Sequence, residues 1–206
     1  MICSSMLRHT PNTSSNITLT SPRPKQILFF DGGSRGNPGP GGSGAIIAEL
    51  TPQASTPKLL WMASISQCSR RTTNNLAEYR GLLAGLKWAL SARISNLHVV
   101  GDSNMILTQL RRRRQPRAVH LRDLYAQCRE LADRLYVCEW SHHLRAFNKA
   151  ADRLANIAMD TRKSRQIFPE DSPELTQLWA PVLQALLGDL EHWNDMRDPV
   201  RDSRSS

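Results

Sequence analysis

Four acidic residues have the type and the placement that metal-dependent phosphoryl transfer requires. Asp31 and Asp102 each end a short apolar run, while Glu78 and Asp152 each lie near the start of an amphipathic stretch. Carboxylates brought close together repel one another unless they are protonated or bind cations. Mg²⁺ prefers oxygen ligands, and two such ions can stabilise both the attacking and the leaving oxygen of a phosphoryl displacement. The sequence therefore offers the ligands of a divalent metal centre.

Each acid alone also has an ordinary structural explanation. Asp31 would suit a turn, Asp102 a helix N-cap, Glu78 a capping partner and Asp152 a solvated ion pair. Metal binding is favoured over these roles only if the fold gathers the four side chains. The elements that carry them therefore decide between the two interpretations.

The apolar pattern predicts one α/β domain over residues 25–160 of a chain of 206 residues. Short apolar runs separated by turn residues are typical of strands, and apolar residues at i, i+3 and i+4 spacings predict amphipathic helices. The expected strands cover residues 25–31, 43–50, 58–65, 96–102 and 135–143, and the expected helices cover residues 75–90, 103–110, 121–135 and 148–160.

The four acids are predicted to converge on one edge of the sheet. A long helix joins the strands that end at Asp31 and Asp102, and a right-handed crossover of this kind lays two strands parallel. Both acids then emerge at the carboxyl edge, where open α/β sheets commonly build their sites. Glu78 is expected in the first turn of the crossover helix, beside a capping Asn75, and Asp152 in the first turn of the last helix.

The charge distribution favours a polyanionic partner. The chain has 27 Lys and Arg against 18 Asp and Glu, a formal net charge of +9. Residues 25–160 hold 19 of the basic and 10 of the acidic residues, so an excess of +9 belongs to the predicted domain. A basic folded surface is typical of proteins that bind nucleic acid. No apolar run approaches the roughly 18 residues that span a bilayer, so no membrane partner is expected.

The remaining composition points to an intracellular protein. Cys3, Cys68, Cys128 and Cys138 form no C-x-x-C pair and fit reduced thiols without assigned chemistry. Residues 1–24 are interpreted as a disordered tail, because they contain no acid and are rich in Ser, Thr and Pro. The same composition loosely suits a mitochondrial transit peptide, but the nucleus or the cytoplasm is the expected location.

Residues 161–206 are expected to form a linker followed by an amphipathic helical extension. The apolar pattern resumes in LTQLWAPVLQALLGDLEHW, where Pro181 interrupts it. Such a segment can fold back on the domain as a helix or bind a partner, and we favour the first interpretation. Since every candidate ligand lies within residues 25–160, that range is expected to suffice for the chemistry.

Four motifs together resemble type 1 ribonuclease H. They stand in the family's order as DGGSRGNPGPGG, TTNNLAEYRGLLAGL, VVGDS and FNKAADRLA, and each contains one of the four acids. The resemblance covers about residues 25–160, and it is specific because four independent motifs coincide. It implies the ribonuclease H fold, in which helices flank a five-stranded mixed sheet of strand order 3-2-1-4-5.

The resemblance also implies an endoribonuclease that hydrolyses the RNA strand of RNA–DNA hybrids with little sequence preference. Asp31, Glu78, Asp102 and Asp152 would hold two Mg²⁺ ions, or Mn²⁺ ions in their place, and products would carry 5′-phosphate and 3′-hydroxyl ends. His142 would assist proton transfer to the leaving oxygen from a mobile loop beside the metals. A monomer is expected.

Contacts with the hybrid carry over in the same way. Asn74 and Asn75, with Asn104 nearby, would meet the RNA strand in the minor groove, while Arg71 and Thr73 would hold a phosphate of the DNA strand. This division fits the general recognition of a hybrid, in which groove shape and 2′-hydroxyls are read and phosphate contacts supply affinity.

Three details of the match have alternatives. Spacing alone selects His142, so the adjacent His143 could take its role, and either could be a polar residue at a strand end. Asn37, inside GNPGPGG, is expected to fix the turn rather than touch substrate. The run RRRRQPR stands where some relatives carry a longer basic protrusion. Its arginines are expected to contact phosphates, the alternative being a solvated turn.

Two other functions would suit the same fold. A nucleic-acid-binding module without catalysis is less favoured because all four acids are present, and magnesium-dependent cleavage of a hybrid would distinguish the two. A 3′–5′ exonuclease is expected to show Asp-x-Glu in its first strand, whereas this strand ends in DGG. A housekeeping enzyme and a retroelement-derived ribonuclease H domain fit the sequence equally well.

Overall fold

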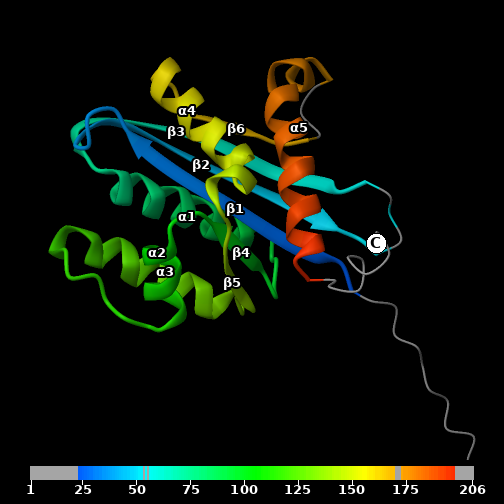
Figure 1. Cartoon of the computed structure of the whole chain (residues 1–206), viewed down its shortest axis with the longest axis horizontal. Helices are drawn as coiled ribbons and strands as arrows, with labels where there is room; N and C mark the ends of the chain where they lie inside the picture. The colour runs from blue at the N-terminus through cyan, green and yellow to red at the C-terminus, as the bar shows by residue number, and fades with distance from the viewer. Residues whose placement is uncertain (1–22, 53, 55, 170–172, 198–206) are drawn as a thin grey trace, which may run out of the picture.

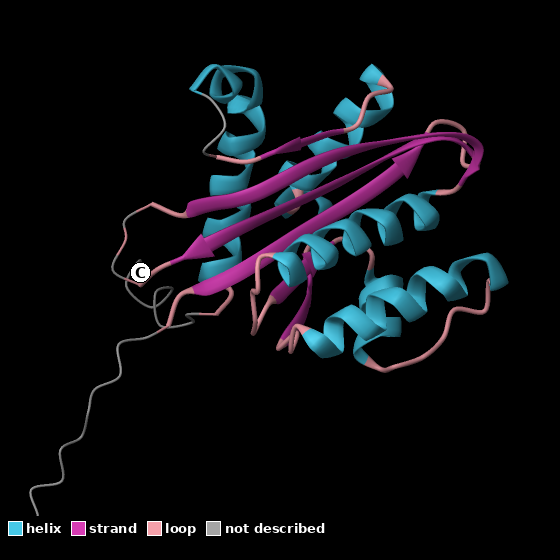
Figure 2. Cartoon of the chain, turned by 180° about the vertical axis from the view of Figure 1, so that it is seen from behind, coloured by secondary structure: helices cyan, strands magenta, loops and turns pink. Residues whose placement is uncertain are grey.

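A mixed β-sheet with helices on both faces forms the centre of the molecule, seen here in a computed structural model (Figure 1). The structure describes residues 23–52, 54, 56–169 and 173–197. Helices α4 and α5 cover one face of the sheet and α1, α2 and α3 lie on the other, as the view from behind also shows (Figure 2). The predicted N-terminal tail, residues 1–24, lies outside the described residues except for its last two.

The sheet has six strands in the order β5-β4-β1-β2-β3-β6. Their bounds are β1 (Lys25–Ser34), β2 (Gly39–Leu50), β3 (Lys58–Thr72), β4 (His98–Gly101), β5 (Glu139–His142) and β6 (Arg165–Ile167). β1, β2 and β3 form an antiparallel meander, while β4 is parallel to β1 and β5 is parallel to β4. The predicted order 3-2-1-4-5 is therefore confirmed for five strands. The predicted number was too low, because the three-residue β6 is too short to show a strand pattern and pairs antiparallel with β3.

The helices follow the predicted sequence of elements. They are α1 (Asn74–Ser91), α2 (Asn104–Arg111), α3 (Arg122–Arg134), α4 (Lys149–Thr161) and α5 (Pro173–Asp195), with 3-10 turns η1 (Val119–Leu121) and η2 (Arg145–Phe147). The predicted capping of α1 by Asn75 was wrong. Thr73 is the N-cap, and its Oγ1 accepts a hydrogen bond from the backbone N of Leu76 at 3.2 Å. Glu78 consequently lies in the second turn of α1, not the first.

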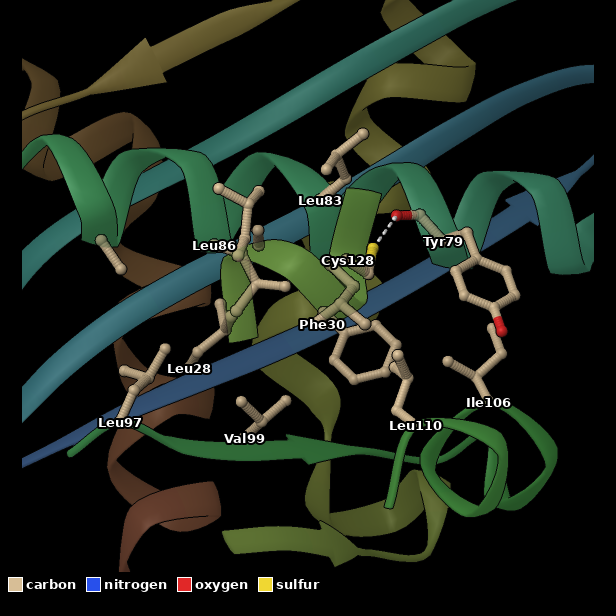
Figure 3. Packing of buried hydrophobic residues seen from close by; sticks show 14 of the residues in the cluster. Leu28, Phe30, Tyr79, Leu83, Leu86, Leu97, Val99, Ile106, Leu110 and Cys128 are labelled. Atoms are coloured by element: carbon tan, nitrogen blue, oxygen red, sulfur yellow. Dashed lines mark hydrogen bonds between the residues drawn. The ribbon is translucent and has the colours of Figure 1, made fainter. Parts of the chain in front are cut away.

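Strand β1 is buried on both faces and divides the core into two layers. Leu28 and Phe30 point toward α1, α2 and α3, where they pack with Leu83, Leu86 and other residues (Figure 3). In the same layer the thiol of Cys128 donates to the backbone carbonyl of Tyr79 at 3.9 Å, as the dashed line in Figure 3 marks. This layer fixes α1 over the sheet, and α1 carries Glu78.

The opposite layer is formed largely by the two C-terminal helices. Ile27 and Phe29 of β1 pack here, together with Trp179 and Trp193 of α5. The helix α5 thus folds back on the sheet beside α4, and Pro181, which was expected to interrupt the pattern, lies inside it. Within the part of the chain that the structure describes, no helix has the combination of length and apolarity that crossing a membrane requires.

Candidate active site

Asp31 and Asp102 lie side by side at the carboxyl edge of the sheet. Strands β1 and β4 run parallel, with Phe30 opposite Gly101, and the two acids are the next residues of each segment. This is the edge at which open α/β sheets place their sites. Asp31 is only 5% exposed, and its Oδ1 accepts a hydrogen bond from the backbone N of Gly32 at 2.6 Å.

Glu78 reaches the same edge because α1 lies directly against β1. A Cβ atom added at Gly32 would lie 2.2 Å from the carbonyl carbon of Ala77 and 2.3 Å from the backbone N of Glu78. Only glycine permits so close an approach. The Ser43 hydroxyl of β2 donates to the Ala77 carbonyl at 2.5 Å and fixes this turn of the helix on the sheet.

The three carboxylates form a cluster with perturbed protonation. One oxygen from each of Asp31, Glu78 and Asp102 lies within 4.8 Å of the other two. Burial, with the charge of Asp102 second, raises the pKa of Asp31 from 3.8 to about 8. Burial likewise raises the pKa of Glu78 from 4.5 to about 7, and it raises the pKa of Asp102.

This donor set fits a hard divalent cation. The Oε2 atom of Glu78 is buried and has no hydrogen-bond partner among the described residues. A buried carboxylate oxygen without a donor, in a cluster whose own repulsion raises pKa values, is stabilised by a cation. Carboxylate oxygens are the ligands that Mg²⁺ and Mn²⁺ share.

Asp152 lies near this cluster but is paired with a basic side chain. It stands in the first turn of α4, as predicted, and its charge contributes to the raised pKa of Asp31. The three-carboxylate group does not include it. Instead, Nη2 of Arg145 donates to Oδ1 of Asp152 at 2.5 Å. The structure therefore brings three of the four predicted ligands together and places the fourth beside them in an ion pair.

The cluster opens into a polar cavity of about 240 Å³. Its lining residues come from β1, α1, α4 and the connections that follow β1, β4 and β5; they are Asp31, Gly32, Gly33, Ser34, Arg35, Asn74, Glu78, Asp102, Arg145, Asn156 and Met159. Three larger cavities, of about 580, 400 and 310 Å³, contain none of the four acids in their walls. The chemistry therefore belongs to the smaller cavity.

The two adjacent histidines have different surroundings. His142 is exposed, and its Nε2 lies 3.1 Å from the backbone carbonyl of Asp102. It is the last residue of β5, inside the strand expected over residues 135–143, whereas the family resemblance implied a mobile loop. His143 is buried, and its ring meets Phe29 and His192 edge-on. Of the two, His142 is the one placed beside the carboxylates.

Asn74 is the one predicted nucleic-acid contact that lines the cavity. Its Oδ1 accepts hydrogen bonds from the backbone N and the hydroxyl of Ser34, at 2.9 and 3.0 Å. Its backbone N donates to Oδ1 of Asn37 at 3.0 Å. Asn37 therefore joins the turn after β1 to the start of α1, which agrees with the turn-fixing role expected for it.

The other four predicted contacts lie around the cavity rather than in its wall. The hydroxyl of Thr73 is used as the N-cap of α1. Arg71, Asn75 and Asn104 are exposed, and Oδ1 of Asn104 accepts a hydrogen bond from Thr108 at 3.2 Å. Three of these side chains are thus accessible to a ligand.

Sequence reasoning missed Arg145 as a member of the site. It lies in η2, between the last predicted strand and the last predicted helix, seven positions before Asp152. A basic residue in the connection next to an acidic helix start was the available signal. No helical or strand periodicity links the two positions, so their pairing depends on how the connection folds.

Comparison with known proteins assigns the chain to a family. The family described as Reverse transcriptase-like matches residues 29–158. This chain therefore belongs to that family, and its similarity to type 1 ribonuclease H domains confirms the resemblance found in the sequence.

Several solved structures that are similar to this chain are ribonuclease H proteins or domains. The N-terminal RNase H domain of Rv2228c from Mycobacterium tuberculosis, solved as a fusion with maltose binding protein, is 40% identical with a TM-score of 0.59, covering 66% of this chain and 94% of that chain. RNase H1 from Halobacterium salinarum NRC-1 is 32% identical with a TM-score of 0.57, covering 66% and 98%. LC11-RNase H1 from compost, in complex with an RNA/DNA hybrid, is 29% identical with a TM-score of 0.57, covering 67% and 99%.

The full-length relatives extend beyond the shared region. Bifunctional protein Rv2228c of Mycobacterium tuberculosis is 37% identical over 158 residues, which are 77% of this chain and 42% of that protein. Ribonuclease HI of Halobacterium salinarum is 34% identical over 140 residues, 64% of this chain and 63% of that protein. The chain thus spans less than half the length of the first relative. Conversely, β6 and α5 lie outside the residues that the family matches.

Proposed function

We propose that this chain is an endoribonuclease that hydrolyses the RNA strand of RNA–DNA hybrids by a two-metal-ion mechanism. The observation that carries the proposal is the group of three carboxylates from Asp31, Glu78 and Asp102, whose oxygens lie within 4.8 Å at the carboxyl edge of a ribonuclease H sheet. A relative named Ribonuclease HI and the LC11-RNase H1 complex with an RNA/DNA hybrid support the same substrate class.

The acidic residues would hold the metal ions. Asp31, Glu78 and Asp102 provide the shared ligands, and Asp152 would complete the set when its carboxylate turns from Arg145. When bound, two Mg²⁺ or Mn²⁺ ions supply Lewis-acid stabilisation of the attacking and leaving oxygens. Binding is favoured because it relieves the repulsion among buried carboxylates.

The remaining side chains would orient the hybrid and move a proton. Asn74 in the cavity wall and the exposed Asn75 would meet the minor groove, where 2′-hydroxyls distinguish the RNA strand. The exposed Arg71 would contact a phosphate of the DNA strand, which adds affinity without sequence preference. His142, exposed beside Asp102, would protonate the leaving 3′-oxygen.

The reaction defines the product ends. Attack of water on phosphorus breaks the bond to the 3′-oxygen, so one product carries a 5′-phosphate and the other a 3′-hydroxyl. A 2′,3′-cyclic phosphate would instead require attack by the RNA's own 2′-hydroxyl. Identification of the ends by mass spectrometry therefore separates the two reactions.

A panel of matched duplexes tests the function. The full chain is incubated with RNA–DNA, RNA–RNA and DNA–DNA duplexes of one sequence, with Mg²⁺, with Mn²⁺ and with EDTA. We expect metal-dependent cutting of the RNA strand in the hybrid alone. Tight hybrid binding with no cutting in either metal would instead identify a catalytically silent binding module.

A further inference from the structure

Helix α5, which lies outside the region matched by the family, contacts the start of the helix that carries Asp152. On the basis of the proposed function, we infer that Asp189 of α5 is a positioning residue for the active site. It caps α4 from outside that helix and so holds Asp152, and the connection before α4, beside the carboxylate cluster.

The cap is made by a buried carboxylate. Oδ1 of Asp189 accepts a hydrogen bond from the backbone N of Lys149 at 3.1 Å, and Oδ2 accepts one from the backbone N of Ala150 at 2.8 Å. These are the first two residues of α4, and Asp189 is 2% exposed. The first N–H groups of a helix have no partner within it, and a negative charge at this end also interacts favourably with the helix dipole.

The residue at the N-cap position of α4 makes a different bond. Asn148 stands at the N-cap position of α4, but its side chain makes no capping hydrogen bond. Its Nδ2 donates instead to the backbone carbonyl of Phe30, the residue before Asp31, at 2.9 Å. Asn148 therefore ties the start of α4 to β1, and Asp189 supplies the cap that Asn148 does not. Both bonds act within one turn of Asp152.

A second residue of α5 holds the connection between β5 and α4. His192 lies three positions after Asp189, and its ring stacks on Phe147 with centroids 3.5 Å apart and planes 10° from parallel. It also meets His143 edge-on at 5.1 Å. Phe147 ends the η2 turn that contains Arg145, the partner of Asp152. α5 thus contacts both ends of the segment that brings Arg145 to the cavity.

These contacts change the expectation for the C-terminal extension. Every proposed ligand lies within residues 25–160, and on that ground the range was expected to suffice for the chemistry. A chain ending at residue 160 would lack the carboxylate that caps α4. Because a displacement of about 1 Å at a reacting centre can cost about a hundredfold in rate, the extension belongs to the catalytic architecture.

The experiment compares three substitutions in the full chain. Asp189→Asn keeps the shape but leaves an amide group facing a backbone N–H, so one capping bond is lost. Glu191→Gln removes an exposed acid from the same helix and is the matched control. Leu186→Ala weakens the packing of α5 through a buried side chain and leaves the cap in place. Each is measured at a temperature where it is fully folded.

Three readouts separate positioning from stability. For Asp189→Asn we expect kcat to fall about tenfold to hundredfold, the Mg²⁺ concentration for half-maximal rate to rise, and KM for the hybrid to stay within about twofold. Glu191→Gln and Leu186→Ala are expected to keep kcat and the Mg²⁺ midpoint within about twofold, although Leu186→Ala melts at a lower temperature. Unchanged kcat and midpoint in Asp189→Asn, or equal losses in Leu186→Ala, would overturn the inference.

A measurement on the metal-free protein keeps this test independent of the proposed function. The NMR chemical shift of the Asp152 amide and the hydrogen exchange of the Lys149 and Ala150 amides are recorded for each variant. We expect a shifted Asp152 signal and faster exchange in Asp189→Asn alone. If the wild-type chain does not cut hybrids, the proposed function fails, while these signals still decide whether Asp189 positions Asp152. An unshifted Asp152 signal in Asp189→Asn overturns the inference.

Discussion

The substitution Asp31→Asn is expected to stabilise the metal-free protein at neutral pH and to remove its stabilisation by Mg²⁺. Burial and the charge of Asp102 raise the pKa of Asp31 from 3.8 to about 8. A folded-state pKa above the unfolded value means that the group's contribution to stability is fully present below about pH 4. That contribution is lost as the pH rises toward 8.

The size of this stability difference follows from the gap between the pKa of Asp31 in the unfolded protein and its pKa in the folded protein. Each pH unit above the unfolded-state pKa costs about 1.4 kcal/mol until the folded-state pKa is reached, so the loss at pH 7 is at most about 4 kcal/mol. Asparagine carries no charge and avoids this loss. At pH 7 a carboxyl group with a pKa of about 8 is largely protonated, so the hydrogen bond that Asp31 accepts from Gly32 is that of a neutral acceptor, worth about 0.5 to 1.5 kcal/mol. Even if asparagine weakens this bond, a net gain of up to about 3 kcal/mol is expected for Asp31→Asn at pH 7.

Urea unfolding at pH 5, 7 and 9 measures this difference, first in EDTA and then in Mg²⁺. The advantage of Asp31→Asn should grow from pH 5 to pH 7. At a Mg²⁺ concentration of about 100 times Kd, the wild type should gain about 2.7 kcal/mol and the variant little. The exposed Asp123, substituted by Asn, serves as the control for removal of an acid. An Asp31→Asn protein that is less stable than wild type in EDTA at pH 7, or equally stabilised by Mg²⁺, would refute the reasoning.

Four further substitutions probe the geometry of the site. Gly32→Ala places a methyl group 2.2 Å from the carbonyl carbon of Ala77, so we expect a loss of about 2 kcal/mol or more in urea unfolding and at least tenfold in rate. His142→Ala should slow cleavage about tenfold to a thousandfold across pH, while His143→Ala should chiefly lower the melting temperature; the reverse pattern would assign the role to the buried histidine. Arg145→Ala should lower the Mg²⁺ midpoint about threefold, because it removes a competing cation from an exposed ion pair, and a raised midpoint would contradict this.

Much of the site could be predicted because local patterns determine it. The apolar runs before Asp31 and Asp102, and the long helix between them, predict a parallel pair of strands that brings the two acids to the same edge, although β1 itself continues to Ser34. Glu78 follows from the same crossover, although the helix begins at Asn74 with Thr73 as its cap. Several polar residues in a row offered more than one cap, so the pattern located the helix but not its first residue.

The parts that could not be predicted depend on contacts distant in the sequence. Asp189 caps a helix that starts 40 residues earlier, and its own position shows nothing but one acid in an amphipathic stretch. The pairing of Arg145 with Asp152 depends on the η2 turn, which has no periodic signature. The short β6 (Arg165–Ile167) exists because the exposed edge of β3 is available for pairing. In each case tertiary packing, not the local sequence pattern, determines which residues come into contact.

Cleavage of a hybrid whose two strands carry different fluorophores tests the central proposal most directly. Wild type and Asp102→Asn are compared on this substrate in Mg²⁺ and in EDTA, with hybrid binding followed by anisotropy. The two-metal site predicts that wild type shortens the RNA strand in Mg²⁺ and leaves the DNA strand intact, while Asp102→Asn binds the hybrid without cutting it. Cutting in EDTA, cutting of the DNA strand, or near-normal turnover by Asp102→Asn would contradict it.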